Sequence, residues 1–394
     1  ASCARSVSTP FASPPRREIQ FPSEQDTAKK NYSPLNKLRA VILTAVAVFC
    51  GVQAYGATYY VATNGNDTNS GTSLASPFLT IQRAVTAVIP GDNVFVRVGS
   101  YPAFSLTNIN GSAAAPITFK PYNSEQVIVD PYLGGGTRPI EFDECSYIVI
   151  DGLELTDSDP KIDEGRMFDL VNNTQAAYDF ALLNGFKSRN GIKFNNAVGS
   201  VRSNNITLKN LVIHHCAGTG ILGKANNVEI SNNEIHDNGA ITEAYGIYVY
   251  GDSILIKGNR CHDNRGGHGI RTGSGNGEAS AYLTNSVIEN NVSYNNNRSW
   301  ILDQTTPISV WQGGDGINLW HGHSNIIRNN VVYGNSWHGI RVNGDSPFNN
   351  RVYNNTIYDN DHFASTYRGI YAYDGETNDI RNNTTGVYVE NGYA

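Results

Sequence analysis

Charged residues, cysteines and long apolar segments are all scarce in this sequence of 394 residues. Asp, Glu, Lys and Arg make up 16% of the chain, which is typical of turn-rich stacked strands. Only three of the five cysteines follow residue 56, and no Cys/His spacing is of the metal-binding type. The spacing leaves a disulfide between Cys216 and Cys261 open. The apolar run at 40–52 is too short to span a membrane.

The scarcity of apolar runs makes the one at 40–52 informative. A basic segment at 37–39 precedes it, and small residues follow it at Ala54 and Gly56, as at a cleavage site. This order is typical of a secretory signal. We therefore expect 1–56 to be a presequence and the mature protein to be secreted or periplasmic.

The remaining chain, residues 57–394, is acidic. The first 56 residues carry seven Lys/Arg and three Asp/Glu, which leaves 22 basic against 32 acidic residues. A general affinity for nucleic acid or for an anionic membrane is excluded on this balance. An anionic substrate would need a local basic patch, and we expect a monomer after removal of the presequence.

Asparagine, glycine and tyrosine are abundant, and they recur in order. From about residue 205 to 383 the sequence repeats Asn-x-apolar-(His/Tyr)-x-Asn, then a turn, then Gly-Ile. Copies of the first half lie at 233–238, 259–264, 291–296, 330–335 and 355–360. The Gly-Ile pairs begin at Gly220, Gly246, Gly269, Gly316, Gly339 and Gly369.

This repeat predicts a solenoid. The shortest spacing between copies is about 23 residues, enough for three short strands and three turns but too little to bury an apolar face alone. Stacked coils share one core, and identical residues then form ladders. Asn suits a turn ladder because it tolerates left-handed backbone and its amide can bond the next Asn. We predict an all-β parallel β-helix over 57–394. We also expect it to be cut short at Ala394, because 386–389 predicts another strand with no polar cap.

Other positions of the repeat are assigned by the same register. His236 and His262 hold the place that Tyr294, Tyr333 and Tyr358 hold in other copies, so we interpret them as ladder residues. Cys261 stands at an apolar position of the repeat, so we expect it to pack in the core.

The start of the mature chain resembles a known family. Residues 58–67 alternate as a strand does, and Ile81, Ala84, Val85 and Val88 recur at helical spacing, which predicts a short helix capping the open end of the solenoid. This segment, to about residue 101, resembles secreted bacterial pectate-lyase-like proteins, including the family-nine polysaccharide lyases. The resemblance implies a right-handed parallel β-helix that acts on acidic polysaccharide.

We expect the chemistry on the strand that begins at each Gly-Ile pair. Alternation turns Ile inward and the next residue outward, and equivalent residues of adjacent coils lie ~4.8 Å apart, close to the rise of one sugar per coil. Tyr and Trp stack on sugars, and Arg binds uronate carboxylates. The residues that we assign to substrate binding are Arg341, His338, Asn318, Tyr248, Tyr250, Trp320 and Tyr371.

Catalysis by β-elimination needs a base and positive charge beside the developing enolate. His268-Gly-Ile-Arg271-Thr-Gly273 resembles the Gly-Phe-Lys-x-Gly segment that carries the catalytic Lys of family nine, with Arg271 in its place. Asn190-Gly-Ile-Lys193 keeps the Lys but lacks the second Gly. The resemblance implies Arg271, Lys193 and His268 as base or charge neutraliser. The family's calcium-binding Asp-Asp-Gly-Trp-Asp run is absent, although Asp315-Gly-Ile resembles part of it, so a calcium cofactor stays open.

Three alternatives remain. A glycoside hydrolase would use two carboxylates, for which Asp315 could pair with Asp303, Glu243 or Asp252. A C5 epimerase would share the proton abstraction, although no Asp-Pro-His-Asp run is present. A surface glycan-binding or adhesin solenoid would need no catalysis. Insertions at 156–189, 272–283 and 297–314 interrupt the repeat, and the last two are expected to rise around a shared cleft.

Overall fold

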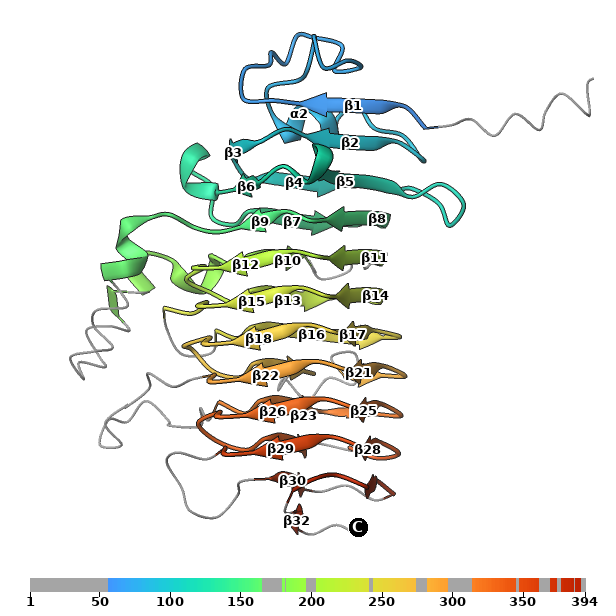
Figure 1. Cartoon of the computed structure of the whole chain (residues 1–394), viewed down its shortest axis with the longest axis vertical. Coiled ribbons are helices and arrows are strands. Elements are labelled where there is room, and N and C mark those ends of the chain that lie inside the picture. The colour runs from blue at the N-terminus through green and yellow to red at the C-terminus, as the bar shows by residue number, and fades with distance from the viewer. Residues whose placement is uncertain are drawn as a thin grey trace, which may run out of the picture. The chain divides into compact units, whose positions relative to one another are not determined.

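The computed structural model contains a stack of coils, each built from three short parallel strands (Figure 1). Its described residues all belong to the compact unit Ala54–Ala394. They are 56–164, 179–180, 182–195, 203–240, 244–273, 282–296, 314–344, 347–360, 369–373, 377–385 and 387–390.

The strands of the described residues form three sheets, which we name by their strand numbers. The eleven-stranded sheet consists of β1 (Thr58–Val61), β2 (Asn93–Val96), β5 (Ile117–Pro121), β8 (Ser146–Asp151), β11 (Asn204–Lys209), β14 (Asn226–Ser231), β17 (Leu255–Lys257), β21 (Val287–Glu289), β25 (Ile326–Arg328), β28 (Arg351–Tyr353) and β31 (Asp379–Arg381).

The nine-stranded sheet follows it along each coil. It consists of β3 (Gly99–Tyr101), β6 (Val127–Val129), β9 (Glu154–Leu155), β12 (Val212–His214), β15 (Glu234–His236), β18 (Arg260–His262), β22 (Val292–Tyr294), β26 (Val331–Tyr333) and β29 (Thr356–Tyr358).

The twelve-stranded sheet completes each coil and begins at the Gly-Ile pairs. It consists of β4 (Phe104–Thr107), β7 (Ile140–Asp143), β10 (Ile192–Phe194), β13 (Ile221–Lys224), β16 (Ile247–Asp252), β19 (Ile270–Thr272), β23 (Ile317–Trp320), β27 (Ile340–Asn343), β30 (Ile370–Tyr373) and β32 (Val387–Glu390), with β20 (Leu283–Thr284) and β24 (Gly322–His323) beside them.

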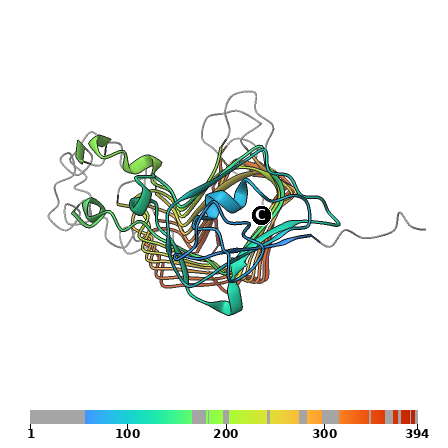
Figure 2. The same ribbon diagram turned by 90° about the horizontal axis from the view of Figure 1, so that it is seen from above.

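The predicted parallel β-helix is therefore confirmed, and Figure 2 shows its coils lying over one another when seen along the stack. The isoleucine of each Gly-Ile pair pairs in register with the isoleucines of the coils above and below. Each is at most 1% exposed, so they form one continuous apolar column. These isoleucines are Ile192, Ile221, Ile247, Ile270, Ile317, Ile340 and Ile370.

The asparagines of the repeat form two buried ladders. In the first, the side-chain amide of each Asn donates to the Oδ1 of the next at 2.9–3.0 Å, from Asn233 to Asn383. In the second, the distances are 2.9–3.1 Å from Asn238 to Asn360. The residue before each ladder Asn takes the left-handed backbone, for example Asn290 with φ 56° and Gly258 with φ 66°. The expectation that one asparagine performs both tasks is wrong, because two neighbouring residues divide them.

The N-terminal coil is closed by a short helix, as predicted. Helix α2 (Ile81–Val85) begins after Thr80, whose hydroxyl accepts a hydrogen bond from the backbone N–H of Arg83. Ile81, Ala84 and Val85 are buried against the first coils. The helix is shorter than the predicted span because the chain turns at Thr86. Single-turn 3₁₀ helices lie at Tyr122–Ser124, Pro131–Gly134 and Phe186–Ser188.

The three cysteines among the described residues, Cys145, Cys216 and Cys261, are buried thiols. Cys261 is fully buried, pairs in register with Ile235 and packs in the core, as predicted. Burial raises the pKa of its thiol. No disulfide joins Cys216 to Cys261, so the connection that the sequence left open is not made.

The insertion at 156–189 is anchored by a buried ion cluster. The guanidinium of Arg189 donates to Asp157 from Nε and Nη2 and to Asp159 from Nη1, each at 2.7 Å. A small apolar cluster that includes Ile162 and Phe186 packs beside the coils. The middle of this insertion lies outside the described residues, as do 274–281 and 297–313, so the predicted cleft is not described. Among the described helices, none has the length and apolar character needed to cross a membrane.

Candidate functional site

The residues after the buried isoleucines form one outward column on the twelve-stranded sheet. Parallel pairing puts each of them beside its equivalent on the next coil, in the order that strand alternation predicts. The column reads Ser105, Glu141, Lys193, Leu222, Tyr248, Arg271, Asn318, Arg341 and Tyr371.

The residues before the glycines form a second column. The amides of Gly220, Gly246, Gly269 and Gly316 donate to the carbonyls of the residues that precede glycine in the next coil. These carbonyls belong in turn to Tyr245, His268, Asp315 and His338. A coil reading Asp-Gly-Ile-Asn is thus enclosed by two coils reading His-Gly-Ile-Arg.

Asp315 lies at the centre of this arrangement and is fully buried. Its Oδ1 is 2.8 Å from Nδ1 of His338 and accepts the His338 backbone N–H at 3.1 Å. Its Oδ2 accepts the amide of Asn318 at 2.6 Å and lies 3.3 Å from Nδ1 of His268. Nη1 of Arg341 is 4.0 Å from the same oxygen. Four polar side chains from three coils therefore converge on one carboxylate.

Burial and these contacts determine the charges of the cluster. Burial by itself would raise the pKa of Asp315, but His338, His268 and Arg341 more than offset it and hold that pKa well below its usual range. Burial lowers the pKa of His268 to about 3, with Asp315 opposing and Arg271 and Arg341 adding to the shift. The cluster is a buried carboxylate beside a neutral imidazole at neutral pH.

The two histidines occupy equivalent positions but use their rings differently. The backbone N–H of Asp315 donates to Nδ1 of His268 at 2.9 Å, so neutral His268 carries its proton on Nε2. In His338, Nδ1 faces the carboxylate at 2.8 Å and donates to it. Neutral His338 therefore has its lone pair on Nε2. Nδ1 thus accepts in His268 and donates in His338.

Arg271 is held by three aromatic rings from the two adjacent coils. Its Cζ lies 5.2 Å from the ring centroids of Tyr245 and Trp320 and 5.3 Å from that of Tyr248. Its Nη1 donates to the Tyr245 hydroxyl at 3.2 Å and is 3.5 Å from Nε2 of His268. Contacts of this kind stabilise a guanidinium in one orientation.

Arg341 is held in the same way two coils further on. Its Cζ lies 4.7 Å from the ring of Trp337, 5.5 Å from Trp320 and 5.6 Å from Tyr371. Trp337 and Tyr371 also pack against the ring of His338, with centroids 4.7 and 4.9 Å away. Trp320 thus contacts both arginines, and Asp315 and Asn318 of the same cluster are fully buried.

Lys193 lies away from this cluster. It pairs in register with Glu141 and Leu222 and is three coils from Arg271, roughly 14 Å along the stack. Burial lowers the pKa of its ammonium, and Arg138 adds to the shift. The structure therefore brings together Arg271, His268 and Asp315 but not Lys193.

The remaining predicted binding residues border the cluster. Tyr248 and Tyr250 both point outward from β16, with ring centroids 5.8 Å apart. Two residues of the cluster were not assigned to the site from the sequence, namely Tyr245 and Trp337. Tyr245 stands in the column before glycine, and this position could have identified it. Trp337 follows a turn outside both columns, so no repeat position indicated it.

The carboxylate pair of the hydrolase alternative is not assembled among the described residues. Asp252 lies at the end of β16, where hydrogen bonds from Thr284, Ser253 and Asn285 lower the pKa of its carboxyl. It serves there as a turn acceptor. Asp303 and Glu243 lie outside the described residues.

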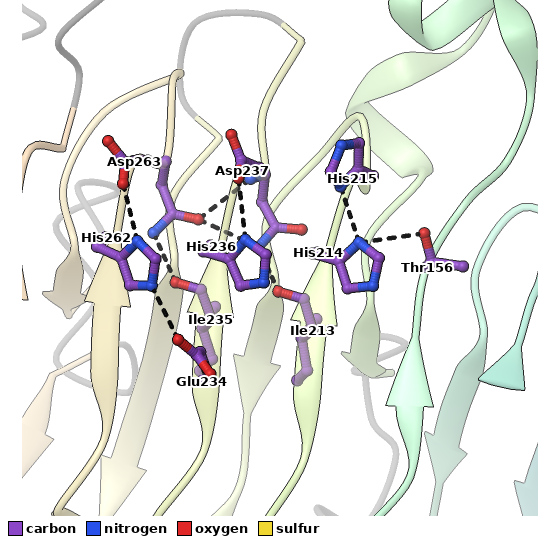
Figure 3. A network of polar contacts seen from close by, with 12 residues as sticks. Thr156, Ile213, His214, His215, Glu234, Ile235, His236, Asp237, His262 and Asp263 are labelled. Atoms are coloured by element: carbon purple, nitrogen blue, oxygen red, sulfur yellow. Dashed lines mark hydrogen bonds and ion pairs between the residues drawn. The ribbon is translucent and has the colours of Figure 1, made fainter. Parts of the chain in front are cut away.

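A stack of imidazoles lies on the nine-stranded sheet, apart from the cluster around Asp315 (Figure 3). His214, His236 and His262 stack with centroids 5.1–5.2 Å apart. The stack continues through Tyr294, Tyr333 and Tyr358 at 4.6–5.0 Å. Acidic neighbours bind the ring nitrogens, such as Asp263 at 2.8 Å from Nδ1 of His262. The predicted ladder role of His236 and His262 is confirmed.

Neither the cluster around Asp315 nor the imidazole stack shows a preformed metal site. Within the part of the chain that the structure describes, no three His, Cys, Asp or Glu side chains are grouped so that they could hold a metal ion. The cluster around Asp315 supplies two imidazoles and one carboxylate, but these bond to one another.

Sequence comparison identifies the family. The family model described as "Right handed beta helix region" matches residues 171–302 and 241–393, more than half of the chain. The chain belongs to this right-handed β-helix family, and its fold is that of pectate-lyase-like proteins.

Individual relatives match over shorter segments. Pectate lyase PEL9 of Emericella nidulans is 36% identical over 86 residues, which are 21% of this chain and 20% of the relative. The uncharacterized protein YwoF of Bacillus subtilis (strain 168) is 36% identical over 70 residues, 18% of this chain and 15% of the relative. The chain thus matches a fifth or less of the length of either relative.

Solved structures match over most of the fold. The alginate lyase from Paenibacillus sp. str. FPU-7 has a TM-score of 0.55 at 17% identity, over 80% of this chain and 96% of the other. Pectate lyase Pel9A has a TM-score of 0.50 at 19% identity, over 86% and 78%. At such low identity the likeness concerns the fold alone.

Proposed function

We propose that this protein is a carbohydrate-active β-helix that cleaves an acidic polysaccharide by β-elimination. The observation that carries the proposal is the enclosed coil, in which an Asp315–His338 pair lies between two guanidiniums on one face of a sheet. The names of the relatives and structural neighbours support a polysaccharide substrate, since they include a pectate lyase and an alginate lyase.

The roles follow from the hydrogen bonds. Arg271 and Arg341 are assigned to carboxylate binding and to neutralising the enolate that forms when the neighbouring proton leaves. His338 is assigned as the general base, because Asp315 holds its proton on Nδ1 and leaves Nε2 to accept one. Its side chain is only 2% exposed, so substrate must displace part of the cover that Trp337 and Tyr371 form. This replaces Arg271 as base, since guanidinium does not release its proton readily.

The same observations favour elimination over hydrolysis. A hydrolase needs one carboxyl group that is protonated at working pH. Asp315 is held ionised by His338 and Arg341, and Asp252 is an occupied turn acceptor. Elimination needs a base and positive charge, which the cluster supplies without a second carboxylate.

The binding track extends the cluster along the sheet. Tyr248, Tyr250, Trp320 and Tyr371 offer aromatic faces, and adjacent rows are ~4.8 Å apart, near the rise of one sugar. Lys193 lies on the same column and is assigned to a distant subsite. Residues 1–56 are proposed as a presequence for secretion, so that the protein, as a monomer, meets its substrate outside the cytoplasm.

The test is incubation of the purified protein with pectate, alginate and glycosaminoglycans. Elimination creates a C=C bond conjugated to the carboxylate, which is followed by ultraviolet absorbance. We expect this product from at least one acidic polymer and its loss in His338→Ala. New reducing ends without that absorbance would show hydrolysis instead, and tight binding without either signal would favour the glycan-binding alternative.

A further inference from the structure

On the adjacent strands β19 and β23, three buried polar atoms have no hydrogen-bond partner among the described residues. They are Nε of Arg271, Oδ1 of Asn318 and Nε1 of Trp320. Outside the site, every buried side-chain nitrogen and oxygen of the described residues has a partner. Folded proteins rarely leave such atoms unpaired, so their gathering at one place indicates a missing ligand.

The three atoms belong to side chains on two neighbouring strands of the sheet. Arg271 and Asn318 are register partners on adjacent strands. Trp320 lies two residues beyond Asn318 on the same face of β23, and its ring is 5.2 Å from Cζ of Arg271. Two N–H donors and one carbonyl acceptor are therefore presented together.

The direction of the Asn318 amide is fixed. Its Nδ2 donates to Oδ2 of Asp315 at 2.6 Å. Turning the amide over would place its oxygen against an ionised carboxylate. Oδ1 therefore stays an acceptor on the side away from Asp315, where a ligand hydroxyl can donate to it.

The donors are held equally firmly. Nη1 of Arg271 is occupied by the Tyr245 hydroxyl, and the guanidinium packs against three aromatic rings. This leaves Nε–H of Arg271 unpaired near the Trp320 ring, whose Nε1–H is also unpaired. A cationic group with two N–H donors suits an anionic oxygen acceptor.

From this arrangement we infer that Arg271, Asn318 and Trp320 form a subsite for a single uronate residue. Its carboxylate accepts from Nε of Arg271 and Nε1 of Trp320, and one of its hydroxyls donates to Oδ1 of Asn318. The inference rests on the proposed function for its place on a polysaccharide track, but it concerns binding and needs no turnover.

The experiment is calorimetric titration with disaccharides of galacturonate, glucuronate, mannuronate and guluronate, each beside its carboxyl-reduced form. The reduced sugars keep the hydroxyls but lose the anion. We expect at least one uronate to bind roughly ten- to hundred-fold more tightly than its reduced form, the effect of hydrogen bonds to a charged group. Equal binding of the two forms, or no binding of any uronate, overturns the subsite.

Variants that remove single donors sharpen the test. Trp320→Phe keeps the ring but loses Nε1–H, and Arg271→Lys keeps the charge but loses Nε–H. Each should reduce the preference for the uronate about ten-fold, whereas Tyr333→Phe on the nine-stranded sheet should leave it unchanged. Melting temperatures show whether the variants fold. A preference that survives in both variants contradicts the inference.

The same samples separate this inference from the proposed function. Ultraviolet absorbance of the unsaturated product reports cleavage independently of the heat of binding. If uronate binds with the expected dependence on Trp320 and Arg271 but no polymer yields that product, the subsite stands and the lyase assignment falls. If product forms while both variants keep the wild-type preference, the lyase stands and the subsite falls.

Discussion

Two aspartate–histidine pairs in this chain have the same contact and different surroundings. Asp263 lies 2.8 Å from Nδ1 of His262 on the nine-stranded sheet, and Asp315 lies 2.8 Å from Nδ1 of His338 at the twelve-stranded sheet. The side chain of Asp263 is 42% exposed, whereas that of Asp315 is wholly buried.

The neighbours of each pair account for the difference. His262 stacks between His236 and Tyr294. The same aspartate–histidine contact recurs on the adjacent coil between Asp237 and His236 (Figure 3). Asp315 instead lies between two histidines and differs from both adjacent coils. In a solenoid, identical residues at equivalent positions of adjacent coils stabilise the stack. Asp315 has no identical neighbour, so its buried charge is better explained by function than by stacking.

Replacing each aspartate by asparagine should give the largest difference in activity between the two pairs. Asp315→Asn keeps the volume but removes the charge that holds the His338 proton on Nδ1. We expect kcat on the responsive polymer to fall roughly 10³- to 10⁴-fold, because the imidazole loses its preferred tautomer. Steady-state kinetics with a melting curve measure both activity and folding.

Asp263→Asn is the matched control. It makes the same change beside a histidine at the same distance, but on the ladder. Its kcat should stay within about two-fold of wild type, since a half-exposed pair contributes little. A similar loss of activity in both variants would show that the effect is general to the fold.

The sequence predicted the scaffold well because the scaffold repeats. Copies of Asn, Ile and Gly-Ile gave the coil length, the inward isoleucines and the ladder role of His236 and His262. The division of work between a left-handed residue and the following ladder Asn was not predicted. Both are often asparagine, as at Asn290 and Asn291, so composition does not distinguish them.

The site was predicted only in part, because it depends on contacts across coils. The two columns could be read from strand alternation, and they placed His268, Asp315 and Asn318 on adjacent rows. Which imidazole nitrogen accepts depends on whether a backbone N–H or a carboxylate faces it. Lys193 matched a motif, but it lies three coils from Arg271. A short motif does not indicate how far apart two residues lie along the stack.

Acid should affect the buried cluster through His268. Burial lowers its pKa to about 3, against about 6.5 in the unfolded chain. Above pH 6.5 the group is neutral in both states and has no effect. Below it, the unfolded chain binds a proton that the folded chain does not, so stability is lost as the pH falls. We expect about 2–3 kcal/mol of loss from this group between pH 6.5 and 4.5.

Denaturant unfolding across this pH range, compared with His268→Gln, measures the contribution. The glutamine oxygen can still accept the backbone N–H of Asp315, but it does not titrate. The variant should therefore lose less stability than wild type on acidification. Parallel curves for the two proteins would mean that His268 is not kept neutral by burial.

The smallest effect is expected on the ladder of the nine-stranded sheet, where it tests whether the stacked histidines contribute to stability alone. His236 stacks between His214 and His262 at 5.2 and 5.1 Å. His236→Ala removes both contacts and should lower the free energy of unfolding by about 1 kcal/mol. His236→Tyr should restore most of it, because tyrosine already stacks at the same position in Tyr294 and Tyr333. Both variants should keep wild-type kcat in the elimination assay. A selective loss of kcat in the tyrosine variant would mean that the imidazoles do more than stack. The functional site would then include His236 on the nine-stranded sheet.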